Sequence, residues 1–148
     1  MPKEVVEVGV KGMWPTNGGA ALFLGCPEKT FVIYVDPFMG HQFALHLNHP
    51  THERPLTHDL VRNLLLGFEA EIQRVVITAV KEGVFWSRLI LRSQQESPQK
   101  WVELDARPSD AILLAVQAKK PIFVTKEVLN VVTNVSDLFG HLLKNREN

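Results

Sequence analysis

The pattern of hydrophobic and polar positions divides the chain into strand-like and helix-like segments. Runs rich in β-branched and aromatic residues, bounded by turn residues, favour extended strands. Strands are therefore predicted at residues 4–10, 20–24, 30–35, 72–80, 84–92, 101–104 and 122–124. Between the fourth and the fifth, Lys81-Glu82-Gly83 predicts a three-residue hairpin turn, because its glycine can adopt a positive φ.

Helices are predicted where apolar residues recur at three- and four-residue spacing. These segments are residues 38–47, 56–67, 108–118, 126–129 and 136–143. Around the second of them, the spacing of one helical face is followed by Leu60, Val61, Leu64, Leu65 and Phe68. The order of the segments predicts an α+β fold, in which a largely antiparallel sheet is packed with helices in a single domain.

Composition and charge narrow the classes of protein to which the chain can belong. Its 148 residues suffice for one domain with a substantial core. The 16 basic and 16 acidic residues balance, which argues against nucleic-acid binding driven by overall charge and leaves room for a local basic groove. The single cysteine, Cys26, excludes an intrachain disulfide, and neither a signal peptide nor an apolar run long enough to span a bilayer is recognisable. We therefore expect a cytoplasmic protein without a membrane partner.

Two stretches, HERPLTHDLVRNLL and DARPSDAILLAV, begin an apolar helix with Arg-Pro and carry an aspartate within its first turns. Two explanations are open. In a purely structural role, proline sets φ for the first turn, and Asp59 and Asp110 complement the positive end of each helix. Alternatively, Arg54, Arg107 and His58 join the aspartates at helix N-termini, where free N–H groups already favour phosphate.

If the anion held there is a phosphodiester, the chemistry to consider is its metal-assisted hydrolysis. That reaction needs carboxylates to hold Mg²⁺ or Mn²⁺, a proton acceptor, and cations that neutralise the developing negative charge. The predicted metal ligands are Asp59, Asp105 and Asp110. The predicted catalytic residues are His58, Asp59, Arg107 and Asp110. The predicted substrate-binding residues are Arg54, Thr57, Arg62 and Ser109.

The chain resembles the bifunctional nuclease domain family in four sequence motifs, which are RPLTHDLVRNLL, RVVIT, ELDARPSDAILLAV and KKPIFVTKEVL. The resemblance covers about residues 4–129, and the segment IYVDPFMGHQFALHL departs from the family pattern at Asp36 and at Met39-Gly40. It implies a compact α+β domain that tends to self-associate, with the DNase and RNase activity attributed to some members. We accordingly assign residues 1–130 to a bifunctional-nuclease-like domain and residues 131–148 to its C-terminal helical extension.

Three functional hypotheses follow. The leading one is a nuclease that hydrolyses DNA or RNA phosphodiester bonds with the help of a divalent metal. The alternative is a non-catalytic binding or regulatory module, in which arginine-rich helix N-termini hold an anionic ligand or a protein partner. In the third hypothesis, Arg-Asp pairs lock the helices together and stabilise an oligomer.

Three neighbouring histidines receive a simpler interpretation than a metal site. His46, His49 and His52 match no well-defined zinc-binding spacing and are interpreted as part of a polar surface loop.

The strand at residues 84–92 presents apolar residues on both sides. We expect the domain's own helices to cover one side and a second subunit to meet the other, which gives a dimer or small ring. One side carries Phe85, Leu89 and Leu91, and the other carries Trp86, Arg88, Ile90 and Arg92. The aromatic ring and the two cations also suit single-stranded nucleic acid, although Ile90 favours a buried contact.

Overall fold

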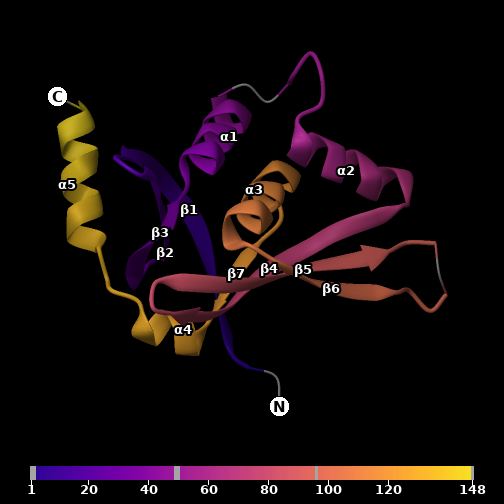
Figure 1. Ribbon diagram of the computed structural model, residues 1–148. Coiled ribbons are helices and arrows are strands. Elements are labelled where there is room, and N and C mark those ends of the chain that lie inside the picture. The colour runs from indigo at the N-terminus through magenta and orange to yellow at the C-terminus, as the bar shows by residue number, and fades with distance from the viewer. Residues whose placement is uncertain (1–2, 49–50, 96, 148) are drawn as a thin grey trace.

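Across residues 3–48, 51–95 and 97–147, which the computed structural model describes, seven strands form one mostly antiparallel sheet (Figure 1). The strands are β1 (Val5–Thr16), β2 (Gly19–Cys26), β3 (Lys29–Val35), β4 (Ala70–Lys81), β5 (Val84–Ser93), β6 (Trp101–Ala106) and β7 (Ile122–Thr125). They lie in the order β3-β2-β1-β7-β4-β5-β6, and among them β4 and β7 pair in parallel. The predicted α+β fold with a largely antiparallel sheet is therefore confirmed.

The long strand β1 joins the two halves of the sheet. Its first residues, Val5 to Val8, pair with β7, whereas Gly9 to Thr16 pair with β2, with a register shift between Val10 and Gly12. The sequence predicted a strand that ends at Val10. The prediction fell short because residues 11–16 include glycine and proline, which are depleted in strands, and the pairing with β2 keeps them extended.

The hairpin between β4 and β5 closes in two residues rather than the predicted three. Lys81 pairs with Val84, and the two residues between them have positive φ angles, 53° at Glu82 and 79° at Gly83. Two positive φ angles are typical of the tight turn whose twist matches that of the flanking strands. Gly83 adopts this conformation readily, as predicted, while Glu82 is held in it by the paired strands on both sides.

Helices α1 (Pro37–Asn48), α2 (Thr57–Gly67) and α3 (Pro108–Ala118) lie against the sheet, with α3 in contact with the other two (Figure 1). α3 packs on β4 and β5, and α1 packs on β2. This interior position explains why α3 contains so few polar residues, since Ile112 and Leu113 at its centre are fully buried. Among the described helices, none is long and apolar enough to cross a membrane.

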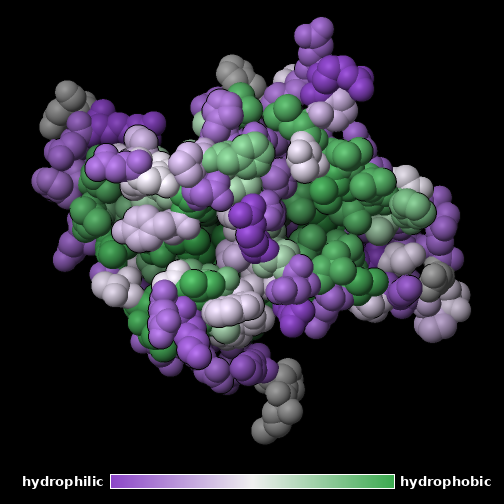
Figure 2. Space-filling view, in the orientation of Figure 1, coloured by the Kyte–Doolittle hydropathy of each residue, from purple (hydrophilic) through white to green (hydrophobic). Residues whose placement is uncertain are grey.

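Helix α2 buries only part of its predicted apolar face. Val61 and Leu65 pack against the hydrophobic core, but Leu60, Leu64 and Phe68 have exposed fractions of 54%, 52% and 75%. The predicted apolar face is therefore divided, with one edge packed on the core and the other exposed. We call Leu60, Leu64 and Phe68 the α2 stripe. Figure 2 shows hydrophobic surface on the side where Figure 1 draws α2.

Helices α4 (Lys126–Val131) and α5 (Ser136–Glu147) follow the last strand. α5 packs back on the start of the chain, where the ring centroid of Phe139 lies 5.8 Å from that of Trp14 and 5.2 Å from that of Phe23. The C-terminal segment is thus joined to the sheet by aromatic contacts. The boundary predicted between residues 130 and 131 falls inside α4, and the division into domain and extension stays a prediction.

Candidate functional site

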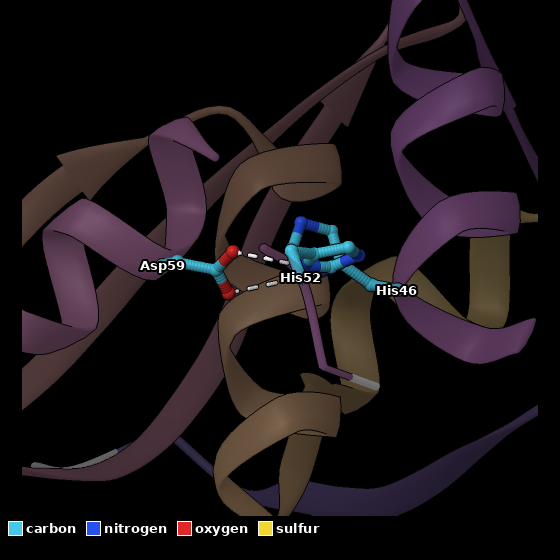
Figure 3. Close-up of side chains that lie close together, drawn as sticks. All are labelled: His46, His52 and Asp59. Carbon is cyan, nitrogen blue, oxygen red and sulfur yellow. Dashed lines mark hydrogen bonds and ion pairs between the residues drawn. The ribbon is translucent and has the colours of Figure 1, made fainter. Parts of the chain in front are cut away.

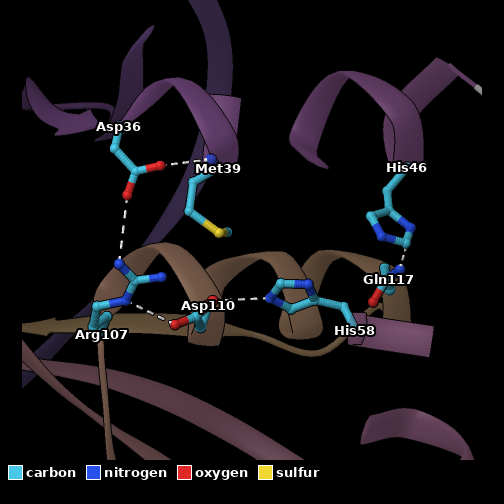
Figure 4. Close-up of polar contacts among 7 residues, drawn as sticks. All are labelled: Asp36, Met39, His46, His58, Arg107, Asp110 and Gln117. Carbon is cyan, nitrogen blue, oxygen red and sulfur yellow. Dashed lines mark hydrogen bonds and ion pairs between the residues drawn. The ribbon is translucent and has the colours of Figure 1, made fainter. Parts of the chain in front are cut away.

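The first turns of α2 and α3 lie together, and their side chains form a series of polar contacts (Figure 4). His58 Nε2 lies 2.9 Å from Asp110 Oδ1, and Arg107 Nε donates to Asp110 Oδ2 at 3.0 Å. Arg107 Nη1 also lies 3.5 Å from Asp36 Oδ2. We call Asp36, His58, Arg107 and Asp110 the Asp110 network. The network connects the starts of α2 and α3, the two segments in which Arg-Pro is followed by an aspartate.

The two helix starts use their aspartates differently. At α2, Asp59 Oδ2 accepts a hydrogen bond from the Leu56 N–H at 2.9 Å, so Asp59 helps to cap the helix. At α3, the N-cap residue Arg107 makes no side-chain cap hydrogen bond within the described residues, and Pro108 occupies the first helical position. The structural explanation therefore accounts for Asp59, whereas Asp110 directs its carboxylate to His58 and Arg107.

Asp36 and Met39, where the chain departs from the family pattern, have distinct environments. Asp36 Oδ1 accepts a hydrogen bond from the Met39 N–H at 2.8 Å, and this hydrogen bond caps the start of α1. The other Asp36 oxygen faces Arg107, and Met39 is fully buried in the core. The departure thus adds a carboxylate to the Asp110 network and an apolar contact beneath it.

Electrostatics keep Asp110 ionised. The hydrogen bond from His58 is the largest influence and, together with Arg107, it holds the pKa of Asp110 below its ordinary value against the opposing effect of burial. The hydrogen bond to Asp110 in turn raises the pKa of Arg107. Asp110 is therefore a carboxylate at neutral pH and can accept a hydrogen bond from His58 Nε2–H.

A second group, His46, His52 and Asp59, lies where α1 ends and α2 begins (Figure 3). Each residue offers one ligand atom, and these atoms lie within 4.8 Å of one another. His52 Nδ1 is 3.0 Å from Asp59 Oδ2, and His46 Nδ1 is 3.7 Å from Asp59 Oδ1. Within the described residues, this is the one group of three such side chains close enough to share a metal ion. We call it the histidine cluster.

The interpretation of these histidines as a polar surface loop is wrong for His46 and His52. The side chain of His46 is only 2% exposed and that of His52 is mostly buried, while His49 lies outside the described residues. His46 follows the buried Met39 and Phe43 on the inner face of α1, and that helical spacing was a signal of its burial. His52 reaches His46 and Asp59 from the connection between α1 and α2, whose course no local sequence pattern predicts.

Burial and hydrogen bonding set the charges of the histidine cluster. Burial lowers the pKa of His46, although the charge of Asp59 opposes this effect. At Asp59, burial by itself would raise the pKa, but hydrogen bonds from the Leu56 N–H and from His52 outweigh it and the pKa is lowered. Near neutral pH these shifts favour a neutral His46 and an ionised Asp59, the forms in which both residue types bind metals.

The histidine cluster adjoins the Asp110 network. The ring centroids of His46 and His58 are 6.1 Å apart, and Gln117 of α3 lies against His46, with Nε2 2.6 Å from Nδ1. Three buried ring nitrogens in these groups have no hydrogen-bond partner among the described residues: His46 Nε2, His52 Nε2 and His58 Nδ1. Buried polar atoms are ordinarily paired, so this concentration favours a functional site over packing alone.

The residues predicted to bind substrate lie at or near the two helix starts. Arg54 and Thr57 are exposed at the start of α2, Arg62 is half-buried further along this helix, and Ser109 is buried at the start of α3. Within the described residues, none of them makes a side-chain hydrogen bond or ion pair with the Asp110 network. Their role in substrate binding stays a prediction.

Asp105 lies on a strand rather than at a helix start. β6 extends two residues beyond its predicted end, so Asp105 is exposed within it and pairs in register with Arg88. Asp59 shares its group of ligand atoms with two histidines, not with Asp105 or Asp110. The three predicted metal ligands therefore occupy three different environments.

A shallow groove of about 270 Å³ opens beside the Asp110 network. Asp36 and Arg107 line it together with Tyr34, Phe85 and Ser109. Tyr34 is 74% exposed, so its ring is accessible to a ligand. A cation beside an exposed aromatic ring is an arrangement that suits the phosphate and the base of a nucleotide.

The predicted contact face of β5 is partly occupied within the chain itself. Ile90 is buried, and Arg92 lies 3.5 Å from Glu71 and 5.9 Å from the ring centroid of Trp101. The part of the predicted subunit contact that relied on Ile90 is therefore wrong. Trp86 on the same strand remains exposed.

Comparison with known proteins identifies the class to which this fold and site belong. The family model described as "Bifunctional nuclease domain" matches residues 23–136. The chain therefore belongs to the bifunctional nuclease domain family, which confirms the resemblance of its motifs. Two uncharacterized proteins of Mycobacterium tuberculosis, from strains CDC 1551 / Oshkosh and ATCC 25618 / H37Rv, are each 29% identical to it over 127 residues, covering 85% of this chain and 73% of the relative.

Proposed function

We propose that the chain is a nuclease that hydrolyses phosphodiester bonds in DNA or RNA. The observation that carries the proposal is the 2.9 Å contact between His58 and Asp110, which unites the two motifs at one point. Membership of the bifunctional nuclease domain family supports it. The groove lined by Tyr34 and Arg107 provides a surface for nucleic acid next to that contact.

In this proposal, His58 is the proton acceptor. The ionised Asp110 accepts a hydrogen bond from Nε2–H, which leaves the lone pair of His58 on Nδ1. Nδ1 is buried in the structure, so in this proposal the neighbouring side chains move to admit the water molecule that His58 deprotonates. Asp110 orients the ring and stabilises the imidazolium that forms when the proton is taken up.

Arg107 neutralises negative charge on the substrate. Its side chain is 60% exposed and lines the groove, while Asp110 holds its Nε. A guanidinium in this position stabilises the charge that develops on the phosphate in the transition state. Further contacts to the substrate are proposed for the residues near the two helix starts, Arg54, Thr57, Arg62 and Ser109.

A divalent ion bound in this region would polarise the phosphate and activate water. The sequence predicted Mg²⁺ or Mn²⁺, but the side chains around Asp59 are imidazoles, whereas Mg²⁺ prefers oxygen ligands in octahedral geometry. The donor set near Asp59 therefore suits Mg²⁺ poorly. Chelation with EDTA, followed by separate addition of Mg²⁺ and Mn²⁺, tests whether cleavage depends on either ion.

The first test is cleavage of fluorescent DNA and RNA oligonucleotides by the purified chain. We expect cleavage by the wild type and a loss of at least about a hundredfold in His58→Ala, because general base catalysis contributes rate factors of this order. The variant, purified in parallel, also controls for contaminating nucleases. Equal cleavage by both proteins would contradict the role of His58.

Tyr34 is expected to bind a base of the substrate. Tyr34→Ala should raise KM for a single-stranded oligonucleotide by about tenfold with kcat little changed, since stacking on an aromatic ring contributes about 1–3 kcal/mol per base. Tyr34→Phe retains the ring and is expected to keep KM near the wild-type value. Steady-state kinetics with one substrate measures both variants, and an unchanged KM in Tyr34→Ala would remove this residue from the binding surface.

The alternative function is a binding or regulatory module without catalysis. It is favoured by the exposed guanidinium of Arg107 beside a helix start, an arrangement that holds anions without any reaction. If the wild type and His58→Ala bind an oligonucleotide equally and neither cleaves it, the binding function is the correct one.

We also propose that the chain self-associates as a dimer or small ring in the cytoplasm. The α2 stripe exposes three large apolar side chains on one side of the molecule, as a subunit contact requires. The single cysteine, Cys26, is buried and free, as is common in the reducing cytoplasm.

A further inference from the structure

We propose that the histidine cluster is a binding site for one transition-metal ion of the Zn²⁺ class, held by His46, His52 and Asp59. The three ligands come from the last turn of α1, from the connection after it, and from the first turn of α2. Figure 3 shows the Asp59 carboxylate facing the two imidazole rings. The site is thus assembled by the fold from three neighbouring segments.

The distances within the cluster suit a single ion. Zn²⁺ lies about 2.0–2.2 Å from imidazole nitrogens and carboxylate oxygens, so ligand atoms of a tetrahedral site are about 3.4 Å apart. The ligand atoms of the cluster already lie within 4.8 Å of one another. Rotation of the side chains is needed to bring one nitrogen of each ring and one carboxylate oxygen to the spacing of a single ion.

The unpaired nitrogens of the cluster point to a ligand. Within the described residues, Nε2 of His46 and Nε2 of His52 are buried without a hydrogen-bond partner, and the His46 side chain is only 2% exposed. Removing an imidazole nitrogen from water without a partner costs free energy, and metal coordination satisfies such a nitrogen. Histidines with a purely structural role are expected to find partners for both nitrogens.

Gln117 is placed to orient His46. Its amide lies against His46 Nδ1, and among the described residues Gln117 Oε1 has no partner (Figure 4). Turning the amide by 180° lets Oε1 accept a hydrogen bond from Nδ1–H. That hydrogen bond selects the tautomer with its lone pair on Nε2, which is how a neighbouring group commonly prepares a histidine for a metal. Because the nitrogen 3.7 Å from Asp59 Oδ1 is Nδ1, the His46 ring has to turn for Nε2 to reach an ion shared with Asp59.

The donor set selects the class of ion. Two imidazoles and one carboxylate are typical of catalytic zinc sites and of non-haem iron(II) sites, whereas Mg²⁺ prefers oxygen ligands. Three protein ligands also leave one coordination position open, as in catalytic rather than structural zinc sites. The inference shares Asp59 with the proposed nuclease, but it concerns binding and is measured without nucleic acid.

The test is a titration of the untagged, chelator-treated chain with Zn²⁺ in a calorimeter and with Co²⁺ in a spectrophotometer. We expect one Zn²⁺ per chain with a Kd of about 1 μM or lower, and Co²⁺ absorption bands that indicate nitrogen and oxygen ligands. A roughly thousandfold excess of Mg²⁺ is expected to leave binding unchanged. His52→Ala and Asp59→Asn are each expected to weaken Zn²⁺ binding by at least about tenfold.

His41→Ala is the matched control, because His41 is an exposed histidine on α1 outside the cluster. Circular dichroism verifies that each variant is folded, and His52 is chosen over the more buried His46 for that reason. The inference is overturned if wild type and His52→Ala bind Zn²⁺ equally, if His41→Ala loses as much affinity as His52→Ala, or if Mg²⁺ displaces Zn²⁺. Cleavage of nucleic acid without Zn²⁺ binding would refute this inference alone, and Zn²⁺ binding without cleavage would refute the nuclease alone.

Discussion

Replacing Asp110 with asparagine is expected to reduce cleavage of DNA and RNA by at least about a hundredfold while leaving the chain folded. The amide keeps the shape of the side chain but loses the charge that orients His58 and stabilises its protonated form. Its N–H₂ group also cannot accept a hydrogen bond, so one of the contacts to His58 and Arg107 is lost. Steady-state rates with fluorescent oligonucleotides measure the effect.

The fold is expected to tolerate this change, because Asp110 caps no helix in the described structure and its side chain is partly exposed. Its ion pair with the exposed Arg107 is of the kind that contributes about 0–1 kcal/mol. Asp137→Asn is the control, since Asp137 is an exposed aspartate in the first turn of α5, outside the Asp110 network, and should keep wild-type activity. Wild-type cleavage by Asp110→Asn would contradict the catalytic role, and its unfolding would favour the hypothesis that Arg-Asp pairs hold the helices together.

The second large effect is expected on assembly. The wild type should be a dimer or small ring at micromolar concentration, and the double variant Leu60→Glu, Leu64→Glu should be monomeric. Both side chains are about half exposed on α2, so charge placed there opposes a subunit contact without entering the core. Glutamate is also a good helix former, so α2 is expected to remain intact. Light scattering after size-exclusion chromatography measures the mass.

Asn63→Glu provides the matched control, because Asn63 is exposed on the same helix but outside the α2 stripe. It is expected to keep the wild-type mass. A monomeric wild type would contradict self-association, and a double variant with unchanged mass would show that the α2 stripe is not the contact.

The motifs of the chain were sufficient to find part of the candidate site. Arg-Pro followed by an aspartate occurs at the start of two helices, and this repetition led to His58, Arg107 and Asp110, which the structure brings into one network. The same reasoning grouped Asp105 with them, although it lies on a strand. Proximity in sequence to the motif did not determine its environment, because successive side chains of a strand point to opposite faces.

The histidine cluster was missed for a different physical reason. A search for regular spacing finds metal sites whose ligands lie on one helix or one tight loop, and His46, His52 and Asp59 come from three segments. Gln117 is still further removed, 71 residues from the His46 that it contacts. Local patterns carry no information about such a contact.

By itself, the sequence determined the class of fold, the type and approximate bounds of its helices and strands, and the family, because hydrophobic periodicity and turn residues act over a few neighbouring positions. Tertiary structure alone decided how far β1 extends, which part of the apolar face of α2 is buried, and which partner each carboxylate takes. Asp59 and Asp110 occupy similar motifs, yet one is surrounded by histidines from α1 and its connection while the other contacts His58 across 52 residues of chain. The packing of α1, α2 and α3 on the sheet determines the partners of each carboxylate. That packing depends on the shape of the whole core rather than on any single stretch of residues.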